Sequence, residues 1–249
     1  MRLARLGCGA LSVGLGAATL VGWGIDSRVL TALRPEYIPM APNTALFFIL
    51  LGGCLGLLPA PASRPRRRFY RAVYGVAALV TTVALLRLAE LGLGLDLGVD
   101  RWIFRFPGGT LGGIPIGKMA FFTALGFATS AAALTLLTPP QPSRPALAAG
   151  AALGMTVLFG GLTFTLGYLY DAPLLYSGRL IPLAMNTALA FIALGAGLFS
   201  RALEHDLQER AAARRRQEME HAVTRVLATS DSLPQAAPRL LEAVGAWLG

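Results

Sequence analysis

The chain has 249 residues, of which 55% are hydrophobic and only 14% are charged. Soluble domains usually carry about 25% charged residues, and a mean hydropathy of +0.59 is high for a chain that faces water. Two cysteines are too few for a disulfide scaffold, the glycines show no collagen period, and the chain is too apolar to be disordered. The composition therefore predicts a helical membrane protein, in which a net charge of +9 reports orientation and not a nucleic-acid partner.

Six apolar stretches are long enough to cross a bilayer core, which needs about 20 residues per helix. They cover residues 6–25, 41–60, 72–93, 119–138, 146–169 and 183–202. Arg2 and Arg5 precede the first stretch, but no Ala-x-Ala-like cleavage site closes it, so we expect a retained helix and not a signal peptide. The sequence thus predicts an all-α, polytopic membrane protein.

The basic residues predict how these spans are oriented. With a cytoplasmic N-terminus, 15 of the 22 Lys and Arg residues lie on the cytoplasmic side, six lie outside, and Arg87 lies within a span. Cytoplasmic loops of membrane proteins carry such an excess. We therefore expect a multi-pass protein with both termini in the cytoplasm and the lipid bilayer as its first partner.

Three segments outside the membrane share one pattern and predict an internal repeat. Residues 38–46 read IPMAPNTAL, residues 181–189 read IPLAMNTAL, and the divergent residues 114–122 read IPIGKMAFF. Their prolines are 76 and 67 residues apart, which is the length of two membrane helices with loops. The chain therefore predicts three tandem helical hairpins of equal orientation. Proline and asparagine are helix-start signals; alternatively, the three starts converge on an outward pocket, with Asn43 and Asn186 as ligand candidates.

Two charged side chains fall inside the third span. Arg87 and Glu90 are spaced i, i+3 on one helix face. Ionisable residues in a membrane are costly and often functional, so the pair is either a structural ion pair or a stimulus site. Trp102 lies in the longest outside loop, residues 94–118, whose aromatic and arginine residues suit the headgroup region, with a ligand contact as the alternative.

Catalytic and metal-binding motifs are missing from the sequence. It contains no HExxH, CxxC, P-loop or GxSxG pattern, and Cys8 and Cys54 lie within predicted spans. We therefore predict no catalytic residue and no metal site in this chain, and no pattern identifies a cofactor.

The composition changes sharply after Ser200. Residues 201–227 are charged and rich in alanine, with no glycine or proline, which predicts a helical or coiled-coil linker that pairs two copies into a homodimer. His205 and His221 are the only histidines, and neither is followed by both the acidic residue and the proline of a kinase phosphoacceptor box. We expect both to be solvated linker histidines.

The end of the chain resembles the opening helices of a GAF domain, and earlier segments resemble the multi-pass N-terminal regions of bacterial sensor histidine kinases. The GAF-like residues are EHAVTRVLA at 220–228 and an amphipathic stretch at 233–248; the kinase-like segments are PNTAL at 42–46 and YLYDAPLLY at 168–176. The resemblance covers essentially the whole chain. It implies a membrane sensor domain at 1–200, a linker at 201–227 and a truncated start of a GAF-like domain at 228–249.

The same resemblance implies a function. The chain would be the input module of a two-component sensor histidine kinase, a fragment without the catalytic domains that passes a signal through its last helix to a cytoplasmic output. A response regulator would be the downstream partner of the full-length protein. Two alternatives stay open: a small transporter or channel built from hairpin repeats, and a membrane anchor for a diguanylate cyclase or another GAF-linked output.

Overall fold

The computed structural model describes residues 1–60, 67–95, 97–102, 109–111, 114–170 and 181–228. The chain divides into two compact units, Met1–Glu204 and His205–Gly249. The described residues are mostly helical, as the composition predicts.

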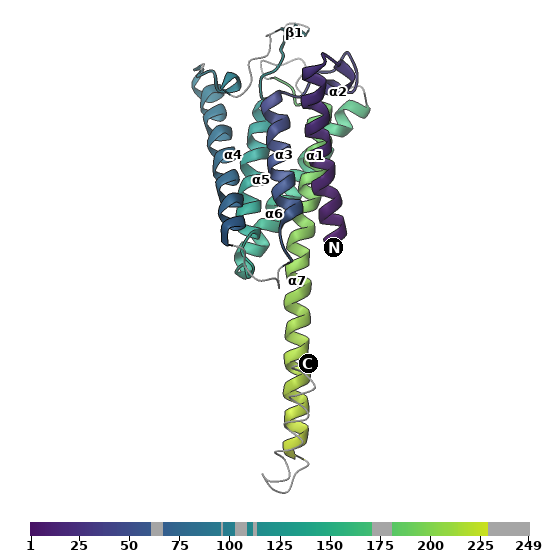
Figure 1. Ribbon diagram of the computed structural model, residues 1–249, viewed down its shortest axis with the longest axis vertical. Coiled ribbons are helices and arrows are strands. Elements are labelled where there is room, and N and C mark those ends of the chain that lie inside the picture. The colour runs from purple at the N-terminus through teal and green to yellow at the C-terminus, as the bar shows by residue number, and fades with distance from the viewer. Residues whose placement is uncertain (61–66, 96, 103–108, 112–113, 171–180, 229–249) are drawn as a thin grey trace. The chain divides into compact units, whose positions relative to one another are not determined.

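The first unit is a bundle of long helices that lie side by side (Figure 1). It contains α1 (Arg2–Gly24), α3 (Pro42–Leu57), α4 (Arg67–Leu93), α5 (Phe121–Leu137), α6 (Arg144–Leu169) and the part of α7 (Met185–Ala228) up to Glu204. Four short elements gather at one end of this bundle, which we call the loop end (Figure 1). They are α2 (Arg28–Ala32), the 3₁₀ helix η1 (Val99–Arg101), and the antiparallel strands β1 (Thr110–Leu111) and β2 (Ile114–Pro115).

Each of the six predicted spans coincides with one of these long helices. Four of them, α1, α4, α6 and α7, are long and apolar enough to cross a membrane, whereas α3 and α5 are shorter apolar helices of 16 and 17 residues. At about 1.5 Å per residue, each of the two short helices covers only about 25 Å, against about 30 Å of hydrocarbon core. The structure therefore supports a multi-pass membrane protein with at least four helices of spanning length among the described residues.

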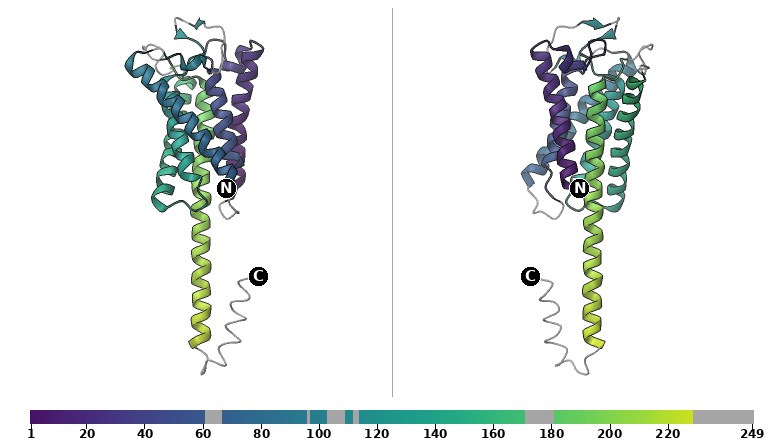
Figure 2. Two further views of the ribbon diagram at one scale, coloured as in Figure 1. Left: turned by 60° about the vertical axis from the view of Figure 1, so that its left-hand side comes forward. Right: turned by 90° about the vertical axis from the view of Figure 1, so that its right-hand side faces the viewer.

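Close glycine contacts join α1 to α3 and α6 to α7. A Cβ atom on Gly16 would lie 2.5 Å from the carbonyl oxygen of Ala45, and one on Gly161 would lie 2.7 Å from that of Ala188. Glycine lets two membrane helices approach until their backbones touch. Ala45 and Ala188 are each the fourth residue of their helix, so the two hairpins are packed at matching positions. Figure 2 shows the first part of α7 beside α6.

The core lies where α3, α5 and α7 face one another. The rings of Phe48, Phe127 and Phe191 contact each other, with centroids 4.8 Å apart for Phe48 with each partner and 5.1 Å apart for Phe127 with Phe191. In the apolar windows of α1, α4 and α6, only 28%, 33% and 22% of residues are buried, against 67% for α7. The apolar surfaces of these three peripheral helices suit lipid and not water.

The helices α3, α5 and α7 begin in the same way. Thr44, Thr123 and Thr187 are each the third residue of their helix. Aligning the three segments on these threonines moves the second segment by three residues from the alignment of Ile114 and Pro115 with the Ile-Pro pairs of the other two. The reason is that these two residues form β2 and not the approach to α5.

In the second unit, the described residues 205–228 are helical throughout. Most of their side chains are exposed, and the ion pair between Arg210 Nε and Asp206 Oδ2, 2.8 Å long, lies at the surface, where such pairs contribute little stability. The predicted linker is thus helical. Apart from Ala228, the segment predicted to begin a GAF-like domain lies outside the described residues.

Candidate functional site

Two groups of buried charged side chains lie in the first unit. The acidic cluster consists of Arg87, Glu90 and Asp100, and the basic cluster consists of Arg5, Arg201 and Glu204. Among the described residues, no group of three or more His, Cys, Asp or Glu side chains is placed to hold a metal ion. The chemistry that both clusters offer is electrostatic.

The acidic cluster contains the pair that the sequence singles out. Arg87 Nη1 donates to Glu90 Oε2 at 2.7 Å, and Arg87 Nε donates to the carbonyl oxygen of Met119 at 3.0 Å. A second carboxylate adds to the pair, because Asp100 Oδ2 lies 3.4 Å from Arg87 Nε. All three charged side chains are at least nine-tenths buried. One guanidinium therefore faces two carboxylates.

The remaining carboxylate oxygens of this cluster bind backbone groups at the loop end. Glu90 Oε1 accepts the N–H of Val99 at 3.2 Å, and Asp100 Oδ1 accepts the N–H of Met119 at 3.0 Å. Burial raises the pKa of the Asp100 carboxyl above its usual range, although Arg87 and the Met119 N–H oppose this shift. The cluster thereby fastens η1 and the approach to α5 onto α4.

The other predicted site residues are distributed around the loop end. Asn43 Nδ2 donates to the carbonyl oxygen of Asp100 at 3.0 Å, which joins the start of α3 to the acidic cluster. Asn186 Nδ2 donates to the carbonyl oxygen of Thr31 at 2.7 Å, a separate contact with α2. Trp102 is 60% exposed. The structure therefore brings Asn43 together with Arg87 and Glu90, and it places Asn186 and Trp102 elsewhere.

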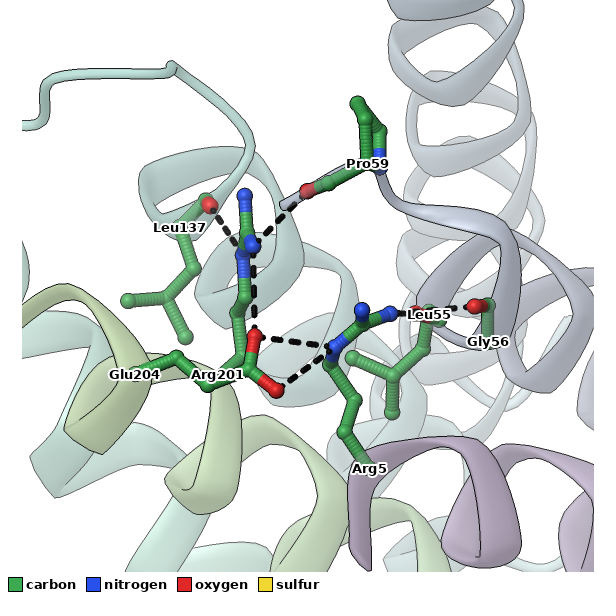
Figure 3. Close-up of polar contacts among 7 residues, drawn as sticks. All are labelled: Arg5, Leu55, Gly56, Pro59, Leu137, Arg201 and Glu204. Atoms are coloured by element: carbon green, nitrogen blue, oxygen red, sulfur yellow. Dashed lines mark hydrogen bonds and ion pairs between the residues drawn. The ribbon is translucent and has the colours of Figure 1, made fainter. Parts of the chain in front are cut away.

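At the opposite end of the bundle, Glu204 lies between two arginines (Figure 3). Arg5 Nε donates to both carboxylate oxygens of Glu204, at 3.2 and 3.1 Å. Arg201 Nη1 donates to Glu204 Oε2 at 3.3 Å. Both arginine side chains are completely buried, and that of Glu204 is 7% exposed.

The two arginines also bind the ends of the two short helices (Figure 3). Arg5 Nη1 donates to the carbonyl oxygen of Leu55, at 2.5 Å, in the last turn of α3. Arg201 Nε donates to that of Leu137 at 3.4 Å, the last residue of α5, and Arg201 Nη1 donates to that of Pro59 at 3.0 Å. Carbonyls at a helix C-terminus lack intrahelical partners, and cations there are favoured by the helix dipole. The basic cluster therefore links α1 and α7 to the C-terminal ends of α3 and α5.

The basic cluster has one positive charge more than its carboxylate neutralises. The Nη2 atoms of Arg5 and Arg201 are buried and have no hydrogen-bond partner among the described residues. Within the described part of the chain, Glu204 is the one acidic group that pairs with both guanidiniums. Removing one member of a buried ion pair is strongly destabilising, because the partner charge stays buried.

Sequence reasoning missed this cluster, although one signal was available. Arg201 and Glu204 repeat the i, i+3 spacing of Arg87 and Glu90, but they lie at and just beyond the end of the last apolar stretch, 183–202, and are assigned to the cytoplasmic side. The expectation that His205 is solvated is wrong: it is 2% exposed, because it follows Arg201 by one turn on the buried face of α7. His221 is exposed, as expected.

Comparisons with known proteins add no assignment to this geometry. No protein-family model, curated protein or solved structure matches the chain.

Proposed function

We propose that the chain is the membrane-embedded input module of a sensor histidine kinase and that it passes its signal through α7. The observation that carries the proposal is the basic cluster. In it, Glu204 of α7 accepts hydrogen bonds from Arg5 of α1. Arg201 of α7 donates to the carbonyl of Leu137 at the end of α5 and to that of Pro59, two residues after α3. Any rearrangement of these helices changes contacts of Glu204, and α7 continues as a helix to Ala228. A displacement at Glu204 would thereby reach the residues that follow.

The proposed topology has six membrane spans in three hairpins, with both termini in the cytoplasm. The short helices α3 and α5 belong to the core, where surrounding helices and not lipid satisfy the polar groups at their ends. The equivalent positions of Phe48, Phe127 and Phe191 support a threefold repeat. The excess of arginine at the N-terminal end and in the linker supports the orientation in the bacterial inner membrane.

The proposed assembly is a homodimer through residues 201–227, followed by a GAF domain and kinase domains that act on a response regulator. Support for the pairing comes from the exposed apolar side chains on this helix. Leu207 is 48% exposed and Met219 is 37% exposed. Exposed apolar positions on a charged helix are typical of a helix that pairs with a second copy.

The test is a disulfide cross-link in the full-length protein in native membranes. Cys8 and Cys54 are first replaced by alanine, and a single cysteine is then placed at Leu207. The matched control carries it at Glu209, which is exposed and faces away from Leu207 on the same helix. We expect oxidation to link two copies through Leu207→Cys much more than through Glu209→Cys, and to change autophosphorylation severalfold.

Two results would contradict the proposal. The first is efficient cross-linking at Leu207→Cys without a change in autophosphorylation. The second is an intact response to stimulus after residues 1–200 are exchanged for an unrelated membrane anchor, which would favour the anchor function. Substrate flux into vesicles that contain the purified chain would instead favour a transporter or channel.

A further inference from the structure

The N-termini of α3, α5 and α7 meet around a small cavity at the loop end of the bundle. Its lining includes Thr44, Thr123 and Thr187, together with Lys118. The cavity has room for about one water molecule. Three helices that start tens of residues apart in the sequence thus each contribute a threonine to the lining of one small, partly open cavity.

These helix starts have no capping side chain. The residues that precede the three helices are Ala41, Ala120 and Ala184, and each is at most 5% exposed. A serine, threonine or asparagine at this position would accept the N–H of the third helical residue, whereas alanine has no acceptor. Buried backbone N–H groups are nearly always paired, so an acceptor for these three helix starts has to come from elsewhere than the preceding side chain.

The third residue of each helix is the threonine that lines the cavity. Thr44, Thr123 and Thr187 are 2%, 3% and 1% exposed. Among the described residues, neither their backbone N–H groups nor their hydroxyls have a hydrogen-bond partner. By contrast, the hydroxyl of the buried Thr165 donates to the carbonyl of Gly161 in its own helix at 2.9 Å. Six potential donors therefore surround the cavity without an acceptor.

The positive charge around the cavity favours an anionic ligand. Helix N-termini carry a partial positive charge and favour anions, and the cationic side chain of Lys118 lies in the lining. A backbone N–H can only donate a hydrogen bond, whereas a hydroxyl can donate or accept. The three backbone N–H groups therefore require an acceptor and disfavour a cation. We propose that the threonine cavity, lined by Thr44, Thr123 and Thr187, binds a small monovalent anion of about halide size. Binding at this cavity requires no signalling role for the chain.

The test uses the purified chain in detergent, with bromide as the probe. Bromide replaces gluconate, which is too large for the cavity, at constant ionic strength, and the midpoint of thermal unfolding is recorded. A ligand that binds the folded state raises this midpoint with its concentration. We expect a rise of several degrees, and a bromide anomalous-scattering peak between the three threonines in crystals.

Valine matches the shape of threonine and removes only the hydroxyl, so Thr44→Val, Thr123→Val and Thr187→Val are the test variants, singly and combined. We expect the combined variant to bind bromide at least tenfold more weakly. Thr156→Val is the matched control, because Thr156 is exposed and its hydroxyl bonds to the carbonyl of Ala152 in its own helix. Should the combined variant not fold, the single variants and the anomalous peak decide. An unfolding midpoint indifferent to bromide, equal bromide dependence in the valine variants, or a cavity that holds only water would overturn the proposal.

Discussion

The acidic and basic clusters each contain an Arg and a Glu spaced i, i+3 on one helix, but the excess charge of the two clusters has opposite sign. Arg87 and Glu90 on α4, like Arg201 and Glu204 on α7, form an i, i+3 pair. Asp100 adds a second carboxylate to the first pair, whereas Arg5 adds a second guanidinium to the second. One turn of helix thus serves as the base of an acid-rich site at one end of the bundle and of an arginine-rich site at the other.

The two clusters differ in charge because different backbone groups need hydrogen-bond partners at the two ends of the bundle. At the loop end, the spare carboxylate oxygens accept the N–H groups of Val99 and Met119. At the opposite end, the spare guanidinium groups donate to carbonyls of Leu55 and Leu137 at the ends of helices. The acidic cluster therefore fixes loops, and the basic cluster fixes helices relative to one another.

The largest expected effect comes from Glu204→Gln. This change leaves two buried guanidiniums without a carboxylate, and losing one side of a buried ion pair costs about 3–5 kcal/mol. We expect a loss of that order in the free energy of unfolding, measured by reversible denaturation of the purified chain in mixed micelles. Glu209→Gln is the control, because Glu209 is exposed on the same helix, and it should change the stability by no more than about 0.5 kcal/mol.

A double-mutant cycle sharpens the same point. In the Glu204→Gln background, Arg5→Met removes one of two repelling buried cations, so the double variant should be more stable than the sum of the single effects predicts. Residues in one network typically couple by about 0.5–3 kcal/mol. Additive losses of stability in this cycle would show that Arg5 acts only through its bonds to Leu55 and Gly56.

The acidic cluster should tolerate the corresponding change better. In Glu90→Gln, Arg87 keeps Asp100 as a counter-ion, and the amide oxygen of glutamine still accepts the Val99 N–H. We expect a loss of about 1–2 kcal/mol, measured in the same unfolding assay. A loss equal to that of Glu204→Gln would remove the distinction between the two clusters.

The smallest effect is a pH dependence at Asp100. Its pKa is raised in the folded protein, so the folded state binds the proton more readily than the unfolded state, and acidification stabilises the fold through this group. The unfolding free energy of wild type minus that of Asp100→Asn should therefore increase as the pH falls from neutral toward the unfolded pKa of aspartate, and then level off. A difference that decreases over that range would contradict the raised pKa.

The long helices could be predicted from the sequence, because each apolar stretch is long enough to favour a helix independently of its tertiary contacts. The Arg87–Glu90 pair was found for the same reason, since a charge inside an apolar stretch stands out. Arg201 and Glu204 could not be found this way. They lie at and just beyond the end of the last apolar stretch, and only the packing of α1, α3 and α5 around them makes them buried.

The starts of α3, α5 and α7 also could be only partly predicted from the sequence. Asn43 and Asn186 are identical in two segments and are therefore ligand candidates, but their amide groups donate to backbone carbonyls of η1 and α2. The feature common to all three segments is a threonine two residues after the first of the helix. The sequence alone aligns Pro115 with the proline of the first segment, and this alignment does not place Thr123 opposite Thr44. The structure shows that Pro115 belongs to β2, which pairs with β1, so Pro115 is not the equivalent of that proline.

In the proposed mechanism, the contacts of Glu204 pass the state of the bundle to the rest of α7. The most direct measurement is autophosphorylation of the full-length protein in native membranes, with Glu204→Gln compared with Glu209→Gln at matched amounts of inserted protein. We expect Glu204→Gln to change the basal activity or its response to stimulus severalfold and Glu209→Gln to leave both unchanged. Wild-type activity and response in the inserted Glu204→Gln protein would contradict it.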